Sequence, residues 1–225
     1  MIIVTGASRG IGQYLFDQYC PSEDIIGTYN NNSSPGKRNN LFKVDITNPE
    51  NIKDFIAEVS SSLKNITLIN CAGINYNSFA HKADLTKWSE VINVNLLGTF
   101  YMISSLLPYM RDQNYGRIIN FGSVVSELPS PGISAYAASK SALFGMTKSI
   151  AAENALRGIT INNINLGYSE LGMIKEVPEN FLETVINRIP SNQLCKKEDI
   201  FSTVEYLRGT EYVNGANINL NGGLI

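Results

Sequence analysis

Short runs of β-branched and other apolar residues alternate with helical patterns almost from one end of the chain to the other. Several of these runs, such as Ile2-Ile3-Val4 and Ile25-Ile26, are apolar without interruption, which is typical of strands covered on both faces. The alternation predicts an α/β protein with a doubly wound parallel sheet of about seven strands and helices on both faces. Because we find no repeat, linker or change of composition, residues 1–225 are predicted to form a single domain.

The pattern also gives approximate bounds for each element. Strands are expected at residues 2–5, 24–29, 41–44, 66–70, 117–121, 159–165 and 217–220. Helices are expected at residues 11–19, 50–63, 86–110, 135–156, 179–188 and 198–208. The polar segment 30–40 is expected to be a surface loop, and the least regular stretch after it is 167–178.

Composition and charge narrow the function classes. A formal net charge of −2 offers no electrostatic footprint for nucleic acid or for an anionic membrane. No apolar run is expected to reach the roughly 20 residues of a membrane span, and no signal peptide is expected before Thr5. Cys20, Cys71 and Cys195 are too widely separated for a metal site or an obvious disulfide framework. We therefore expect a cytoplasmic protein without a metal.

Three glycines lie where the first expected strand meets the first expected helix, in the run Thr5-Gly6-Ala7-Ser8-Arg9-Gly10-Ile11-Gly12. Glycines there let the turn tighten, let the backbone approach a pyrophosphate and let the helix pack near the strand. The phosphates would bind at the free N–H groups and the positive dipole end of the helix. The cluster predicts the dinucleotide site of a Rossmann fold, with an ordinary strand–helix turn as the alternative.

Tyr136 and Lys140 are four residues apart at the start of an expected helix, so both project from one face. A neighbouring ammonium favours the phenolate, and bringing a tyrosine pKa from its usual value to neutrality takes about 4 kcal/mol. We expect Lys140 and a bound nicotinamide cation to supply this together. Ser123, after the fifth expected strand, is placed to donate a hydrogen bond to a substrate carbonyl. Asn95 lies in the preceding long helix.

The Gly-x-x-x-Gly-x-Gly spacing, the Tyr-x-x-x-Lys spacing and a serine thirteen residues before the tyrosine resemble the classical short-chain dehydrogenases/reductases. The resemblance covers the whole chain, through Gly158-Ile159-Thr160-Ile161-Asn162 to Asn221-Gly222-Gly223, and is strongest to β-ketoacyl-acyl-carrier-protein reductases and related carbonyl reductases. It implies a catalytic tetrad in which the tyrosine transfers the proton and the serine orients the carbonyl. The lysine holds the nicotinamide ribose and the asparagine holds a water. The tetrad residues are Asn95, Ser123, Tyr136 and Lys140.

The same resemblance implies a set of cofactor-binding positions. The family's aspartate after the third strand binds the adenine amino group, and its Asn-Asn-Ala-Gly element passes close to the ribose. Here that element reads Asn70-Cys71-Ala72-Gly73. The implied set is Gly6, Ser8, Arg9, Gly10, Ile11, Gly12, Asn30, Asp45, Ile46, Asn70, Ala72, Gly73, Tyr136, Lys140, Gly167 and Ser169.

One segment departs from the family pattern. After the sixth strand the family has Pro-Gly and then a threonine that helps to hold the nicotinamide carboxamide, but here Leu166 and Leu171 replace the proline and the threonine. Ser169 is the replacement hydroxyl that we consider. At the other end of the cofactor, the second strand is followed by Asn30 and no acid, and Arg9 lies where the family contacts a 2′-phosphate. This favours NADP(H), with NAD(H) as the alternative cofactor.

Substrate and partners are less defined. A small-molecule ketone or secondary alcohol is expected, with a β-ketoacyl thioester as one form. An apolar pocket or simple core packing would equally explain Tyr168, Leu171, Met173, Ile174, Val177 and Phe181. Related reductases bind an acidic acyl carrier protein through basic residues near the site, but the corresponding turn 111–117 is only weakly basic, leaving Arg157 as another contact.

The helix at 135–156 is apolar on more than one face, which predicts a homo-oligomer, by resemblance a tetramer built on this helix and its neighbour. Two other functions stay open for the chain as a whole. One is a sugar-nucleotide epimerase or dehydratase, and the other is a non-catalytic cofactor-binding regulator.

Overall fold

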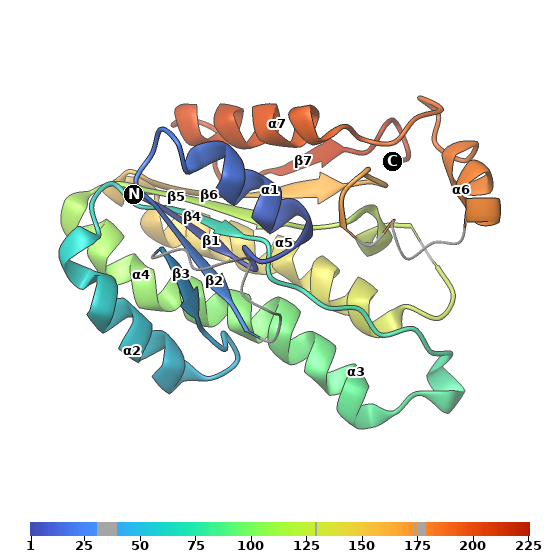
Figure 1. Ribbon diagram of the computed structural model, residues 1–225, viewed down its shortest axis with the longest axis horizontal. Coiled ribbons are helices and arrows are strands. Elements are labelled where there is room, and N and C mark those ends of the chain that lie inside the picture. Colours follow the sequence, from blue (N-terminus) through green and yellow to red (C-terminus); the bar gives the residue numbers. More distant parts are fainter. Residues whose placement is uncertain (31–39, 129, 173, 175–178) are drawn as a thin grey trace.

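The computed structural model describes residues 1–30, 40–128, 130–172, 174 and 179–225. Seven parallel strands form one sheet in the order β3-β2-β1-β4-β5-β6-β7 (Figure 1). They are β1 Ile2–Thr5, β2 Ile25–Tyr29, β3 Leu41–Lys43, β4 Thr67–Asn70, β5 Gly116–Phe121, β6 Ile159–Leu166 and β7 Asn217–Leu220. The predicted fold class, a doubly wound parallel sheet of the Rossmann type, is confirmed.

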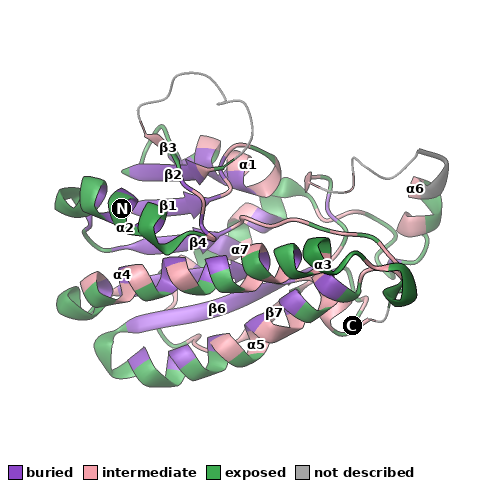
Figure 2. Cartoon of the chain, turned by 90° about the horizontal axis from the view of Figure 1, so that it is seen from below, coloured by how far each residue is buried: buried purple, intermediate pink, exposed green. Residues whose placement is uncertain are grey.

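Helices cover both faces of the sheet, and the alternation of side chains along each strand divides the core in two. In β1, Ile3 packs with residues of α2, α4 and α5, whereas Ile2 and Val4 pack with residues of α1 and α7. Figure 2 shows the buried strands between these two layers. The helices are α1 Gly10–Tyr19, α2 Pro49–Val59, α3 Leu85–Ile92, α4 Thr99–Gln113, α5 Ser134–Asn154, α6 Glu179–Ile186 and α7 Lys197–Gly209.

Most elements begin and end within two residues of the expected bounds. The helix expected at 50–63 ends earlier, because its last turn, Ser60–Ser62, is a 3₁₀-helix. The helix expected at 86–110 is continuous from residue 85 to residue 113 but contains a π-helical segment, Asn93–Gly98, between α3 and α4. The apolar pattern does not reveal this segment because one wider turn hardly changes which residues face the sheet.

The helix spanning residues 85–113 corrects one expectation. It is 29 residues long and contains an 18-residue window with a mean hydropathy of 1.4, so by length and composition alone it could cross a membrane. Met102, Ile103 and Leu106 are nevertheless fully buried against α2 and the sheet. A core helix of a soluble protein passes the same test, so this helix is weak evidence for a membrane span.

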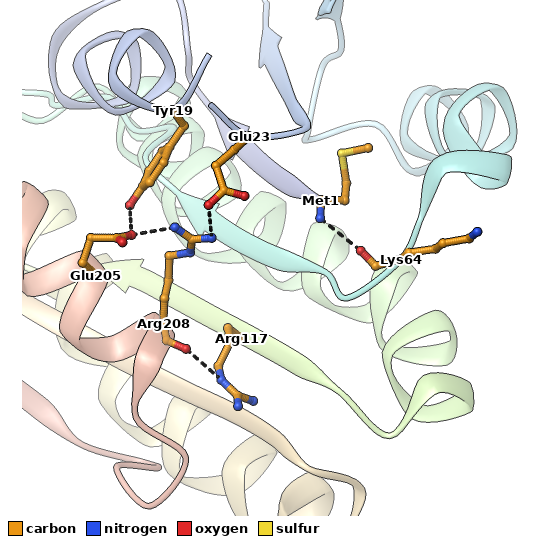
Figure 3. A network of polar contacts seen from close by, with 7 residues as sticks. All are labelled: Met1, Tyr19, Glu23, Lys64, Arg117, Glu205 and Arg208. Atoms are coloured by element: carbon orange, nitrogen blue, oxygen red, sulfur yellow. Dashed lines mark hydrogen bonds and ion pairs between the residues drawn. The ribbon is translucent and has the colours of Figure 1, made fainter. Parts of the chain in front are cut away.

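A network of charged groups joins elements at the amino ends of the strands (Figure 3). The Arg208 guanidinium donates to Glu205 of its own helix at 2.6 Å and to Glu23, just after α1, at 3.2 Å. Glu205 also accepts from the Tyr19 hydroxyl at 2.6 Å. The Arg208 carbonyl accepts from Arg117 of β5, so the network holds α7 against α1 and the sheet.

Candidate active site

The opposite edge of the sheet, at the carboxyl ends of the strands, gathers the residues singled out from the sequence. Strand order reverses between β1 and β4, and this is the position at which open α/β sheets bind ligands. Gly6 follows β1 with φ +67°, and a Cβ built on it would stand 2.8 Å from the Ala72 Cα that follows β4. Only a glycine therefore fits here, and the turn and the β4 exit lie in direct contact.

The glycine turn leads into the N-terminus of α1. Arg9 is the N-cap residue and its side chain is exposed, while Ser8 and Ile11 are half-buried. A Cβ on Gly12 would overlap the Gly6 carbonyl oxygen, so Gly12 keeps the first turn of the helix tight against the loop. Free backbone N–H groups at this helix end, next to an exposed arginine, form a suitable place for an anion.

The residues assigned to the adenine and its ribose lie beyond the strand ends. Asn30 is exposed just after β2. Asp45 lies two residues after β3, which ends at Lys43, one residue before the expected bound. The Asp45 carboxylate accepts from the Thr47 N–H at 2.9 Å and from its hydroxyl at 2.7 Å, so one of its oxygens shapes the turn into α2. Ile46, the next residue, is buried against Gly98.

Thr5 and Asn70 fix the exit of β4. The Thr5 hydroxyl accepts the backbone N–H groups of Cys71 and Ala72, both at 3.1 Å. The Asn70 amide donates to Asn120 of β5 at 2.9 Å. These bonds hold Ala72 and Gly73 beside the glycine turn. No role for Thr5 was predicted from the sequence. The available signal was its position, because Thr5 is the last residue of β1 and directly precedes Gly6.

Tyr136 and Lys140 lie on the first turns of α5, and Ser123 follows β5. Burial raises the pKa of the Tyr136 phenol to about 12, and a hydrogen bond with the Ser123 hydroxyl offsets part of this increase. Lys140 is almost fully buried; its ammonium donates to the Phe121 carbonyl at 2.7 Å and lies 5.6 Å from the centre of the Tyr136 ring. Burial lowers the pKa of Lys140 to about 8.

The expected lowering of the Tyr136 pKa by Lys140 and a bound nicotinamide cation concerns the protein with its cofactor, and it stays a prediction. In the protein without cofactor, burial is the dominant influence on this pKa, and the phenol stays protonated at neutral pH. Lys140 retains donor capacity. Among the described residues its ammonium has one hydrogen-bond acceptor, Phe121, whereas an ammonium carries three N–H donors.

Asn95 is buried in the π-helical segment. Its side chain accepts from the Ile74 N–H and donates to the Ile74 carbonyl, both at 2.9 Å, and it also donates to the Ser139 hydroxyl at 3.1 Å. A Cβ on Gly73 would stand 3.3 Å from Asn95 Oδ1 and 3.9 Å from Lys140 Nζ. Asn95 thus joins the β4 exit to α5. Ser139 was not predicted from the sequence, where only its place directly before Lys140 distinguishes it.

The segment after β6 is only partly described. Gly167 packs on Asn221, where a Cβ would stand 2.8 Å from the Asn221 Cα. The Ser169 hydroxyl is buried and donates to the Leu171 carbonyl at 2.9 Å, which leaves it able to accept but not to donate elsewhere. Of the expected pocket residues, Tyr168, Leu171 and Ile174 are partly exposed. Met173, Val177 and the Phe181 side chain lie outside the described part of the chain.

The basic residues considered for a carrier protein lie elsewhere in the chain. The turn 111–117 precedes β5 and Arg157 precedes β6, so both lie at the amino ends of the strands, away from Ser123 and Tyr136. Arg117 is buried and donates to three backbone carbonyls, those of Gly116, Gly158 and Arg208. These arginines therefore form no basic surface beside the candidate active site of the same chain.

Comparison with known proteins agrees with this architecture. The ligand-free aldohexose dehydrogenase of Thermoplasma acidophilum is similar in structure, with a TM-score of 0.90 and 27% identity over 99% of this chain and 92% of that one. The 3-oxoacyl-acyl-carrier-protein reductase of Vibrio cholerae is 31% identical over 99% of this chain and 96% of its own length. The acetoacetyl-CoA reductase of Shinella zoogloeoides is 34% identical over 98% of this chain and 96% of its own length.

The family model for short chain dehydrogenases matches residues 1–181, which include the glycine turn, Ser123, Tyr136 and Lys140. This match and the relatives over almost the full chain confirm the resemblance inferred from the motifs. The chain therefore belongs to the short-chain dehydrogenase family.

Proposed function

We propose that the protein is an NADP(H)-dependent oxidoreductase that interconverts a ketone and a secondary alcohol. The observation that carries this proposal is the hydrogen-bonded pair Ser123–Tyr136 beside the buried ammonium of Lys140. These groups lie at the carboxyl ends of the strands, at the same edge of the sheet as the glycine turn. A proton donor, an orienting hydroxyl and a cation are the groups that carbonyl reduction requires.

The chain's own groups handle the proton. In the reducing direction the Tyr136 hydroxyl donates its proton to the carbonyl oxygen, and its raised pKa keeps this proton in place at neutral pH. The Ser123 hydroxyl donates a hydrogen bond to the same oxygen and holds the carbonyl in line. The Lys140 ammonium stabilises the negative charge that proton loss leaves on the phenol. NADPH supplies the hydride when bound.

The residues present fit a dinucleotide. Gly6 and Gly12 occupy places where a Cβ would collide with neighbouring backbone, so the turn is as tight as a pyrophosphate site requires. Arg9, exposed at the N-terminus of α1, is available for a 2′-phosphate, and Asn30 puts no negative charge after β2. The remaining N–H donors of Lys140 would hold the nicotinamide ribose, and Asp45 would reach the adenine. These features favour NADP(H) over NAD(H).

A β-ketoacyl thioester is the substrate class we propose first. The names of two relatives specify such substrates, one carried by an acyl carrier protein and one by coenzyme A. Because Arg111, Arg117 and Arg157 lie at the far edge of the sheet, a small thioester is better supported than a carrier-bound one.

The direct test is NADPH oxidation measured with a panel of simple ketones and β-ketoacyl thioesters. We expect turnover with NADPH on at least one thioester. If NADPH is oxidised with none of these carbonyls, the cofactor-binding regulator is the remaining function. If a sugar nucleotide added to the panel is converted instead, the protein is an epimerase or dehydratase.

The cofactor preference is tested with Arg9→Ala. Loss of one charge-assisted contact should weaken NADPH binding by about 1.5–3 kcal/mol and leave NADH binding unchanged, so NADH is the internal control. Equal affinities of the wild-type protein for the two cofactors would refute the assignment.

We also propose a homotetramer built partly on α5 and its neighbouring helix. Ala138, Gly145 and Ala152 are exposed along one side of α5, and Leu97 and Phe100 are exposed on the neighbouring helix. A Cβ on Gly145 would meet nothing within 4 Å, so a second helix has room to approach. Light scattering should give a mass well above 24.7 kDa, lowered by Gly145→Trp but not by Gly145→Ala. A wild-type mass near one chain would mean that the protein is a monomer.

A further inference from the structure

Ser139 joins Tyr136, the proton donor of the proposed function, to Asn95, the asparagine of the predicted tetrad. It lies on α5 between Tyr136 and Lys140 and is fully buried. Its hydroxyl donates to the Tyr136 carbonyl at 2.8 Å and accepts from the Asn95 side-chain amide at 3.1 Å. Because a hydroxyl has a single proton, these two bonds fix its orientation completely.

The chain of bonds continues from Asn95 to the exit of β4. The Asn95 amide holds both backbone groups of Ile74 at 2.9 Å, and its second N–H is the one given to Ser139. Gly73, next to Ile74, lies between Asn95 and Lys140. A continuous line of buried and part-buried hydrogen bonds therefore runs from the β4 exit through the π-helical segment to the turn of α5 that carries Tyr136.

We propose that Ser139 is a positioning residue, which sets the distance between the β4 exit and the turn of α5 that bears Tyr136 and Lys140. The proposal rests on the proposed function, because Ser139 acts through Asn95 and the backbone of Tyr136 and touches no reactant. Without the hydroxyl, one N–H of the Asn95 amide is buried with nothing to bond, so the amide rotates and releases Ile74. The proton donor and the β4 exit then move relative to each other.

The position of Ser139 is tested first without turnover, by hydrogen exchange at the Ile74 amide, whose N–H is bonded to Asn95. Ser139→Ala should speed this exchange about tenfold, the factor expected from weakening one hydrogen bond of ordinary strength. The matched control is Ser141→Ala, which removes a hydroxyl from the same helix that is bonded instead to the Ser126 carbonyl at 3.0 Å. Unchanged exchange at Ile74 in Ser139→Ala would overturn the proposal.

The effect on catalysis is tested by a double-mutant cycle. Ser139→Ala should lower kcat about tenfold or more with the KM of the ketone little changed, because the reacting groups are misplaced but still present. If Ser139 acts through Asn95, the double variant Asn95→Ala/Ser139→Ala should lose no more kcat than Asn95→Ala alone. Losses that multiply would show that Ser139 does not act through Asn95. Absence of turnover in the wild-type protein would refute the proposed function, and the exchange experiment would still decide the role of Ser139.

Discussion

The two edges of the sheet hold buried polar groups of different kinds. At the amino edge, the guanidinium of Arg117 donates to three carbonyls and to Glu211, and Arg208 binds two carboxylates. At the carboxyl edge, Lys140 is equally buried but donates to one carbonyl among the described residues. The Tyr136 phenol there is hydrogen-bonded to another hydroxyl, that of Ser123.

This difference separates polar groups that hold the fold from polar groups available for chemistry. The buried Arg117 guanidinium makes a hydrogen bond with each of its nitrogens, so it stabilises the elements that it joins and has little left to offer a ligand. A buried ammonium with unused donors is costly unless a ligand completes its bonds. The pKa of Lys140 falls to about 8 because burial outweighs the raising effect of the neighbouring Cys71. Four changes test the comparison.

The largest effect is expected for Tyr136→Phe at the carboxyl edge. The variant keeps the ring but lacks the transferable proton, so kcat should fall on the order of 10²- to 10⁴-fold while NADPH affinity is retained. Steady-state kinetics and a cofactor titration measure the two quantities. Tyr206→Phe, on the exposed side of α7, is the control and should behave as wild type. Near-wild-type turnover in Tyr136→Phe would show that the Tyr136 hydroxyl is not the proton donor.

The next effect is expected at the amino edge, for Arg208→Ala. Loss of the bonds to Glu205 and Glu23 should lower the free energy of unfolding by about 1.5–3 kcal/mol and leave kcat per folded molecule unchanged. Urea unfolding measures the first quantity, with the exposed Arg157→Ala as control. If kcat falls and the free energy of unfolding does not, Arg208 contributes to catalysis and the two edges do not have separate roles.

A smaller effect is expected from pH. With a pKa of about 8, Lys140 loses its charge as the pH rises, whereas Tyr136 stays protonated because its pKa is about 12. The kcat/KM for ketone reduction should be constant below about pH 8 and should fall about tenfold per pH unit above it. In Lys140→Arg the break should move to higher pH. A break that stays in place would assign it to another group.

The smallest effect is expected for Tyr19→Phe. Burial, followed by the hydrogen bond to Glu205, raises the pKa of the Tyr19 phenol, so this hydroxyl is present only as a donor. Because Arg208 still binds Glu205 in the variant, the free energy of unfolding should fall by only about 1 kcal/mol. If the double variant with Arg208→Ala loses the sum of the two single effects, the network is not cooperative.

The sequence by itself determined the architecture and the identity of the residues at the site. Uninterrupted apolar runs and helical spacing depend on neighbours a few positions apart, so they predicted the strands, the helices and the parallel sheet without knowledge of long-range contacts. The glycine turn and the Tyr136–Lys140 spacing are also local. The catalytic roles of these residues stay predictions.

Tertiary structure alone decided how these residues are held and charged. The pKa of Tyr136 rises because the folded chain buries its phenol, and no local spacing encodes that burial. The π-helical segment at Asn95 exists where α3, α4 and α5 meet the β4 exit. Arg117 looked like part of a basic surface turn, but it is the second residue of β5 and is enclosed by partners up to 94 positions away. Burial and charge are set by residues that meet only when the chain has folded.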